Sequence, residues 1–314
     1  MLSTNAPRRQ LAGAPRTPGS RAGRTVALAA AGIASLAPLP SQAAPRSGPA
    51  ECRAAAATRD TIAGLGPRGE LRLGSGGQAV LGSLRWPEEP EDARAAEAWL
   101  QARVGQPLTL VARGEADRWG RIRVDAQTEG ADATDLAGGL IGAGLAPADA
   151  GEGETLCRPA LLALEEAPRA AGRGIWARPR PAATDGTALR ARAGRFAIVE
   201  GRVRRVGERA ARTYLDFGPS GEDALTVTVS KRTWRRLLER GLSAAGLRGR
   251  RVRARGILEI WRGPTLDVAS AEAIEVLPRD PFELLCRKEM PSQGQQPDRK
   301  AGKKHDSTQQ SKPS

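Results

Sequence analysis

The pattern that most constrains the fold of this chain is a series of short alternating strands interrupted by one amphipathic helix. Within residues 194–279, three stretches alternate between polar and apolar residues. A helix is predicted from Lys231 to Leu242, with Trp234, Leu237 and Leu238 on its inner side, and two or three more strands follow it. The three stretches before the helix are RFAIVEGRVRRVGE, RTYLDFG and ALTVTVS. Five short strands with a helix between the third and the fourth predict an OB-type β-barrel.

A similar order of elements occurs earlier, in residues 67–178. A helix is predicted from Glu91 to Val104, because apolar residues recur there every four positions on one face. Later helices are predicted from Thr134 to Gly144 and from Pro159 onward, where Pro168 should kink or shorten the helix. The predicted strands are Glu70 to Leu73, Gln78 to Leu84, Pro107 to Ala112 and Gly120 to Ala126. The predicted fold class is therefore mainly β with inserted helices, arranged as two OB-type barrels.

The first 44 residues are typical of an export signal peptide. They contain five arginines and no acidic residue, then an apolar run from Thr25 to Leu39 and the small-residue boundary Ser41 to Ala44. Of the 49 Lys and Arg residues, 44 remain after its removal against 35 Asp and Glu, which leaves a net charge of +9. We therefore expect a basic protein that is periplasmic or secreted, with no membrane span after cleavage.

Three further segments lack apolar periodicity. Residues 45–66 and 179–193 are rich in Gly, Pro, Ala or Arg and are predicted to be linkers, the first of them flexible. Residues 287–314 are rich in Lys, Gln, Ser and Pro and are predicted to form a disordered basic tail. The 314 residues thus contain two domains between a leader and a tail.

The cysteines and the one histidine limit the possible chemistry. Three cysteines in an exported chain are consistent with one disulfide and one remaining thiol, and the sequence alone does not choose the pair among Cys52, Cys157 and Cys286. The single histidine, His305, lies in the polar tail. A His-ligated metal centre and a His-activated cysteine nucleophile are therefore not expected.

The first domain resembles the thermonuclease family, the staphylococcal-nuclease-like domains. The resemblance covers about 110 residues and is carried by four runs in series. Its most specific pieces are the Asp-Arg-Trp-Gly-Arg turn and the Gly-Ile-Trp-Ala ending. The four runs are LRLGSGGQAVLGSLRWPEEP, RVGQPLTLVARGEADRWGRIRV, ATDLAGGLIGAGLA and LLALEEAPRAAGRGIWA.

Catalysis in that family, as the resemblance implies, uses a Ca²⁺ held by carboxylates, a glutamate that activates water and two arginines that neutralise the phosphate. Two matching positions keep the family's residue, since Glu88 matches the glutamate and Arg121 the second arginine. Three do not: Gly69 and Arg85 stand in place of aspartates, and Val80 in place of the first arginine. We therefore expect no bound metal and no catalysis, with Glu88 and Arg121 as vestigial candidates.

Two interpretations of the surviving charges stay open. Arg85 can fill the vacated metal site by pairing with Glu88, Glu89 or Glu91. Glu88 and Arg121 either retain a phosphate contact or remain only as surface charges or a turn-stabilising pair.

The second domain carries the candidate residues for nucleic-acid binding. Arginines on its first and fourth predicted strands are expected to neutralise phosphates, and nearby aromatic residues are expected to stack on bases. Alternatively, the aromatic side chains are core residues, and the arginines face an anionic envelope component or a protein partner. The candidates are Arg202, Arg204, Arg251, Arg253, Arg255, Tyr214 and Trp261.

These observations lead to a noncatalytic hypothesis and an enzymatic one. In the first, the chain is an exported module that binds single-stranded nucleic acid or another partner, without a cofactor. In the second, it is a Ca²⁺-dependent nuclease that hydrolyses extracellular or periplasmic DNA or RNA. The identities of Gly69 and Arg85 favour the first hypothesis.

Overall fold

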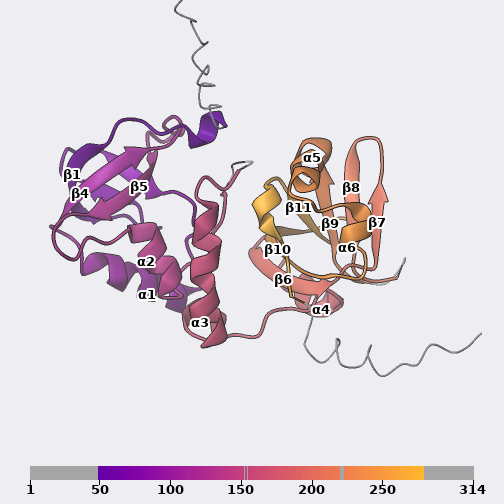
Figure 1. Ribbon diagram of the computed structural model, residues 1–314. Helices are drawn as coiled ribbons and strands as arrows, with labels where there is room; N and C mark the ends of the chain where they lie inside the picture. Colours follow the sequence, from indigo (N-terminus) through magenta and orange to yellow (C-terminus); the bar gives the residue numbers. More distant parts are fainter. Residues whose placement is uncertain (1–48, 152, 154, 220–222, 279–314) are drawn as a thin grey trace, which may run out of the picture. The chain divides into compact units, whose positions relative to one another are not determined.

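The chain divides into two units, residues 1–46 and 47–314. The computed structural model describes residues 49–151, 153, 155–219 and 223–278, all of which belong to the second unit. The predicted leader and basic tail lie outside the described residues. Along the described chain two β-barrels follow one another, as the strand labels in Figure 1 show. No helix of the described residues is long and apolar enough to cross a membrane.

The first barrel closes through five strands in the order β1-β2-β3-β5-β4. Neighbouring strands are antiparallel except β3 and β5, which pair in parallel with Ala79 opposite Ile122. Helix α1 (Pro90–Gln101) lies in the chain between β3 and β4. The strands are β1 (Thr58–Leu65), β2 (Leu71–Leu73), β3 (Gln78–Leu81), β4 (Pro107–Ala112) and β5 (Ile122–Thr128). This connectivity confirms the predicted OB-type barrel.

Helix α1 begins where the sequence favours a helix start. Pro90 occupies the first helical turn, and Glu91 and Asp92 place negative charge at the positive end of the helix dipole. Ala96 and Leu100, one turn apart, are fully buried in the core of the first barrel. The apolar face of α1 that the sequence predicts therefore packs against the core of the first barrel.

The predicted helix from Pro159 is interrupted. A 3₁₀ segment (Pro159–Glu165) comes first, and the short helix α3 (Glu166–Ala170) continues it. Pro168 lies in the first turn of α3, where its missing N–H removes no intrahelical hydrogen bond. Helix α2 (Leu136–Gly142) and a 3₁₀ turn (Gly174–Trp176) complete this part.

Both predicted linkers contain regular structure, which corrects the sequence prediction. β1 lies within 45–66 and pairs with β4 on one side and β2 on the other, so the barrel does not close without it. Ile62 is the one buried residue of β1, and the surrounding Ala and Gly residues hide its alternation. Helix α4 (Gly186–Arg190) lies within 179–193, with Leu189 fully buried.

The second barrel repeats the strand pairings of the first. β10 pairs with β6 and with β11, and β11 pairs in parallel with β9, as β5 does with β3 in the first barrel. β6 and β7 are separated by two residues and together act as the first strand, since β7 pairs with β8 and β8 with β9. The strands are β6 (Phe196–Arg202), β7 (Arg205–Glu208), β8 (Arg212–Asp216), β9 (Thr226–Ser230), β10 (Arg251–Ile260), β11 (Pro264–Val268) and β12 (Ile274–Val276).

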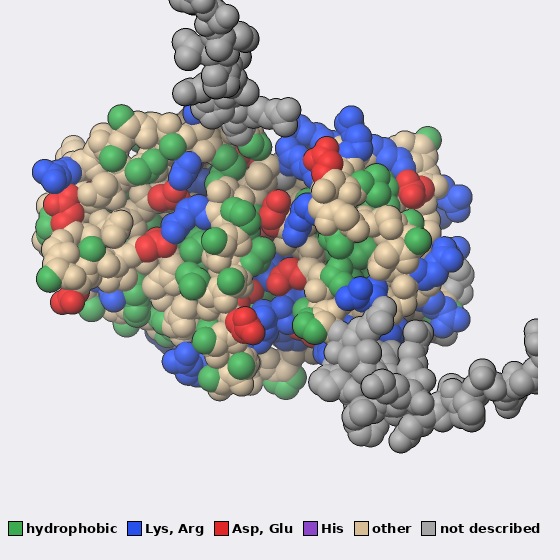
Figure 2. All heavy atoms as spheres, in the orientation of Figure 1, with side chains coloured by type: hydrophobic (Ala, Val, Ile, Leu, Met, Phe, Trp, Pro, Cys, Tyr) green, Lys and Arg blue, Asp and Glu red, His purple; other side chains and the backbone are tan. Residues whose placement is uncertain are grey.

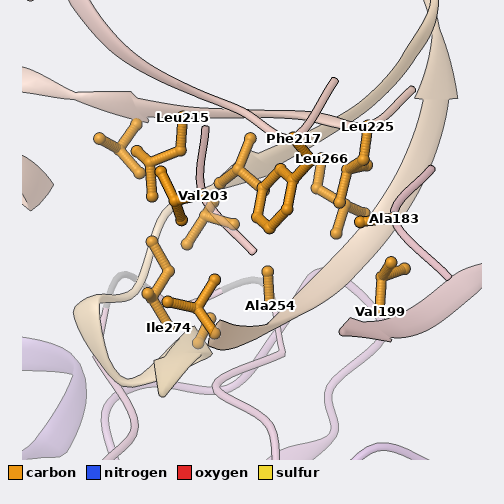
Figure 3. Packing of buried hydrophobic residues seen from close by; sticks show 14 of the residues in the cluster. Ala183, Val199, Val203, Leu215, Phe217, Leu225, Ala254, Leu266 and Ile274 are labelled. Carbon is orange, nitrogen blue, oxygen red and sulfur yellow. The ribbon is translucent and has the colours of Figure 1, made fainter. Parts of the chain in front are cut away.

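The core of the second barrel is aliphatic with few aromatic side chains. Figure 3 shows Phe217 among Leu215, Leu225 and Leu266, with Val203 close by. Phe217 is therefore a core residue of this barrel.

Helix α5 (Lys231–Glu239) lies between β9 and β10, and α6 (Ala244–Leu247) follows it. Ser230 caps α5 by accepting a hydrogen bond from the Thr233 N–H. Trp234 and Leu237 are buried as predicted, but Leu238 is 45% exposed. Thr233 is also buried, so the buried face of the helix includes Thr233 in place of the predicted Leu238.

Candidate functional site

The residues that match the nuclease metal site line a pocket on the first barrel. This pocket of about 220 Å³ is lined by residues that include Gly69, Glu70, Arg121 and Asp149. Gly69 has φ +71°, and a Cβ on it would lie 2.2 Å from the Trp86 ring. An aspartate at position 69 therefore does not fit unless the indole moves.

Glu70 and Arg121 neutralise one another in this pocket. Arg121 Nη1 lies 3.1 Å from Glu70 Oε1, and its Nε lies 2.8 Å from Asp117 Oδ2. Burial by itself would raise the pKa of Glu70, but the backbone N–H of Arg68 and the Arg121 guanidinium outweigh it and hold that pKa below 4.5. The arginine that matches the family's phosphate clamp is thus already engaged by two carboxylates.

Asp149 is a pocket residue that the sequence analysis missed. It follows a loop without strand or helix periodicity, so no sequence signal marked it. Burial raises its pKa above the ordinary 3.8, and the charge of Arg85, whose Nη1 lies 3.9 Å from Asp149 Oδ2, offsets this only in part. The pocket therefore holds two carboxylates, Glu70 and Asp149, each beside an arginine.

These residues do not fit a calcium site. Ca²⁺ takes six to eight oxygen ligands, most of them from carboxylates and carbonyls. Among the described residues no group of three or more His, Cys, Asp and Glu side chains is arranged to hold a metal ion. Arg85 moreover brings a guanidinium to the position where the resemblance implies an aspartate.

Glu88 lies apart from Arg121. Its carboxylate lies 3.4 Å from Arg85 and 3.6 Å from Arg195, and it accepts a hydrogen bond from the Phe196 N–H. Arg85 thus pairs with Glu88, as one open interpretation predicted, and not with Glu91. Glu88 lines a second pocket that Arg121 does not reach, so the two vestigial candidates do not form one site.

Backbone pairing gathers arginines on the second barrel. The Val203 N–H donates to the Arg250 carbonyl over 2.9 Å, and the Gly249 N–H donates to the Val203 carbonyl over 2.7 Å. Arg202 lies directly opposite Arg251 in the β6–β10 ladder. We call the resulting set the arginine cluster: Arg202, Arg204, Arg205, Arg248, Arg250 and Arg251. Figure 2 shows Lys and Arg side chains gathered over the second barrel on the face drawn.

Five of the six arginines in the cluster are exposed, and Arg250 is half-buried. Arg205 pairs with Asp216 at 2.8 Å, and Arg251 pairs with Glu200 at 3.0 Å. Arg204 and Arg248 are exposed, and neither pairs with a carboxylate of the described residues. Arg202 donates to the Gly249 carbonyl over 2.7 Å, so members of the cluster are also held by the backbone.

Arg253 and Arg255 are buried, which corrects their expected place on the solvent face. Arg253 pairs with Glu200 at 2.6 Å, and Arg255 pairs with Glu165 of the first barrel at 2.7 Å. The Arg255 and Glu165 side chains are 1% and 0% exposed. The alternation of β10 correctly predicted that both side chains point away from the barrel core. It did not predict that other residues cover this outward face of β10. Neither guanidinium is available to a phosphate.

The two aromatic candidates occupy different places. Tyr214 is half-buried on the outer face of β8, opposite Gly207 and Thr228, and so is not a core residue. Trp261 is 74% exposed and directly follows β10, whose other end begins at Arg251. At about 3.3 Å per residue the length of β10 separates these two residues by roughly 30 Å. The structure therefore brings Arg202, Arg204 and Arg251 together but leaves Trp261 outside the arginine cluster.

Comparisons with known proteins show no family for this chain. No family model matches this chain, and no curated protein matches it. The resemblance to thermonucleases therefore stays a prediction from the sequence.

The chain is similar to several solved structures over about a third of its length. OBody AM1L10 bound to hen egg-white lysozyme is 19% identical, with a TM-score of 0.22, over 28% of this chain and 85% of that one. Asparaginyl-tRNA synthetase from Pyrococcus horikoshii is 16% identical, with a TM-score of 0.24, over 31% of this chain and 23% of the synthetase. The extended Tudor domain of Drosophila melanogaster Tudor-SN is 24% identical, with a TM-score of 0.26, over 32% and 47%. Similarity at this level carries no argument about fold or activity.

Proposed function

We propose that this chain is an exported, noncatalytic protein that binds single-stranded nucleic acid through the arginine cluster of its second barrel. The observation that carries the proposal is the pairing of Arg202 with Arg251, flanked by Arg204 and Arg248. A phosphate backbone is attracted to such a group of positive charges and releases counterions when it binds. Binding of oligonucleotides is a common function of OB-type barrels.

The noncatalytic part of the proposal rests on the first barrel. Trp86 covers Gly69, Arg85 stands beside Asp149, and Arg121 is paired with Glu70. Cleavage by the mechanism that the resemblance implies needs two free arginines to hold the phosphate and a glutamate near it to activate water. These residues do not provide that arrangement. The first barrel then serves as a rigid support for the second, to which the Glu165 to Arg255 pair joins it.

Export is supported by a covalent bond. Cys52 and Cys157 form a disulfide, which requires an oxidising compartment to persist. The predicted signal peptide agrees with this location, and the mature chain would then start near Ala44. N-terminal sequencing of the protein from its native host tests this part, and an intact leader in the cytosolic fraction would contradict it.

The binding part of the proposal predicts a defined salt dependence. For the full mature chain and a fluorescent single-stranded oligonucleotide, log affinity should fall linearly with log salt, by about 0.7 per phosphate contact. Arg204→Ala with Arg248→Ala should flatten this slope by about 1.4, because two contacts are removed. Fluorescence anisotropy at several salt concentrations between about 50 and 200 mM measures both slopes.

A matched control keeps the change in net charge the same. Arg53→Ala with Arg94→Ala removes two exposed arginines outside the cluster and should leave the slope unchanged. An equal effect of both double variants would show that binding follows net charge and not this cluster. Absence of binding at low salt would overturn the nucleic-acid proposal, and an anionic envelope polymer or a protein partner would then be the better account.

A further inference from the structure

Each barrel carries one strongly exposed tryptophan at the same topological position. Trp119 is 60% exposed and lies between β4 and β5, the fourth and fifth strands of the first barrel. Trp261 is 74% exposed and lies between β10 and β11, the fourth and fifth strands of the second. They are the two most exposed large hydrophobic side chains of the described residues. Large aromatic side chains this exposed are typical of binding surfaces.

The loop that carries Trp119 is held in one shape. Asp117 accepts hydrogen bonds from the backbone N–H groups of Trp119 and Arg121, both over 2.9 Å. Gly120, with φ +76°, closes the turn. The guanidiniums of Arg118 and Arg121 lie 4.0 and 4.8 Å from the Trp119 ring centroid. The indole is thus presented on a fixed turn with two guanidiniums close to its ring.

The loop that carries Trp261 has the same design with different contacts. The Trp261 N–H donates to the Gly263 carbonyl over 3.2 Å, which closes a three-residue hairpin loop between β10 and β11. The indole Nε1 donates to Glu259 Oε2 over 2.6 Å. That bond is made at the ring edge and leaves the ring faces open. The neighbouring Arg262 is exposed.

We propose that these two Trp–Arg loops are a pair of base-stacking sites that engage one single strand at two points, one on each barrel. The inference rests on the proposed function and adds where bases are contacted. The exposed Arg118 and Arg262 beside the two indoles match a phosphodiester backbone, and an indole stacks on any unpaired base. Stacking of a base on Trp119 also contributes more free energy than the exposed cation–π contact of Arg118 that the base would displace. The loop between the fourth and fifth strands is moreover a ligand-contacting loop of OB-type barrels.

Two linked sites predict a dependence on oligonucleotide length. A strand too short to reach both loops binds at one, so losing a single tryptophan changes its affinity at most about twofold. A long strand uses the second contact at high effective concentration. Trp119→Ala or Trp261→Ala alone should then weaken binding of a long strand by about 5- to 100-fold.

The experiment uses the full mature chain and fluorescent oligothymidylates of increasing length. Affinities are compared for the wild type, both single tryptophan variants, the double variant and Leu238→Ala, which truncates an exposed apolar residue on α5 as a control. Intrinsic tryptophan fluorescence gives a second readout, since quenching by a bound strand should be largely lost in the double variant. Urea unfolding of each variant checks that the fold is retained.

The outcomes separate this inference from the proposed function. Equal affinities of the wild type and both tryptophan variants for a long strand, with weaker binding by Arg204→Ala with Arg248→Ala, would overturn the stacking sites and leave the arginine cluster standing. Loss on Trp261→Ala but not on Trp119→Ala would overturn the two-point model. No binding by the wild type would overturn both proposals. Both proposals are supported if each tryptophan substitution weakens the affinity only for strands longer than a certain length.

Discussion

At the scale of single residues, Arg255 and Glu165 form a buried ion pair that affects the stability of the fold. Arg255 donates from Nη1 to Glu165 Oε1 and to the Ala148 carbonyl, both over 2.7 Å, and it also pairs with Glu275. Removing Glu165 takes away the fully buried partner of Arg255 and leaves only the partly exposed Glu275 to balance its charge. We predict that Glu165→Ala lowers the free energy of unfolding by about 3–5 kcal/mol, measured by urea denaturation.

Replacing both Arg255 and Glu165 tests whether the loss of stability comes from a buried charge that has lost its partner. Arg255→Met with Glu165→Leu removes both charges while keeping apolar volume, and should cost much less than the single change. Additive effects of the two substitutions would show that the pair is not coupled and would contradict this reading.

Glu70 makes stability depend on pH. Its pKa in the folded chain lies below 4.5, so the stability it contributes is present above that value and is lost as the pH falls through the lowered pKa. Glu70→Gln should lower the free energy of unfolding at neutral pH by about 1–2 kcal/mol, because Arg121 loses a charged acceptor. Urea denaturation at a series of pH values should show this difference shrinking below pH 4.5. A difference that stayed constant down to strongly acidic pH would contradict the assigned role.

At the scale of elements, the segment before β1 is tied to the loop before the Pro159–Glu165 turn by the Cys52–Cys157 disulfide. The bond spans a sequence separation of 105 residues. Closing a loop of this length restricts the unfolded chain strongly. We predict that reduction destabilises the fold by about 2–5 kcal/mol.

A variant with Cys286→Ser isolates this bond, since it leaves only the two paired cysteines. Urea unfolding with and without a thiol reductant then measures the contribution of the disulfide. Unchanged stability on full reduction, verified by thiol titration, would show that β1 is held by its ladders alone.

The elements predicted correctly are those with a clear period. Four strands of the first barrel and helix α1 were predicted because apolar residues alternate or recur every four positions, and each faces a core. β1 was missed because a strand with one buried side chain, Ile62, has almost no alternation to detect. Helix α4 was missed for the same reason, since a five-residue helix is too short for a period. Periodicity reports burial on one face, and short or exposed elements lack that signal.

At the scale of the whole molecule, the candidate site was only partly predictable. Alternation identified which β10 residues point away from the barrel core, but the sequence does not show that Glu165 and Ala148 cover Arg255 there. Asp149 gave no signal because it gains its partner, Arg85, only through the fold. Arg202 and Arg251 were placed together correctly, since the pairing of first and fourth strands follows from the barrel topology.

The central claim is that this chain holds single-stranded nucleic acid without cutting it. One measurement tests it most directly: anisotropy of an end-labelled single-stranded oligonucleotide with the full mature chain, in Ca²⁺ and then in a chelator, followed by sizing of the recovered strand. We predict the same affinity under both conditions and a strand recovered at full length. Shortening of the strand in Ca²⁺ that the chelator prevents would contradict the account and establish a nuclease.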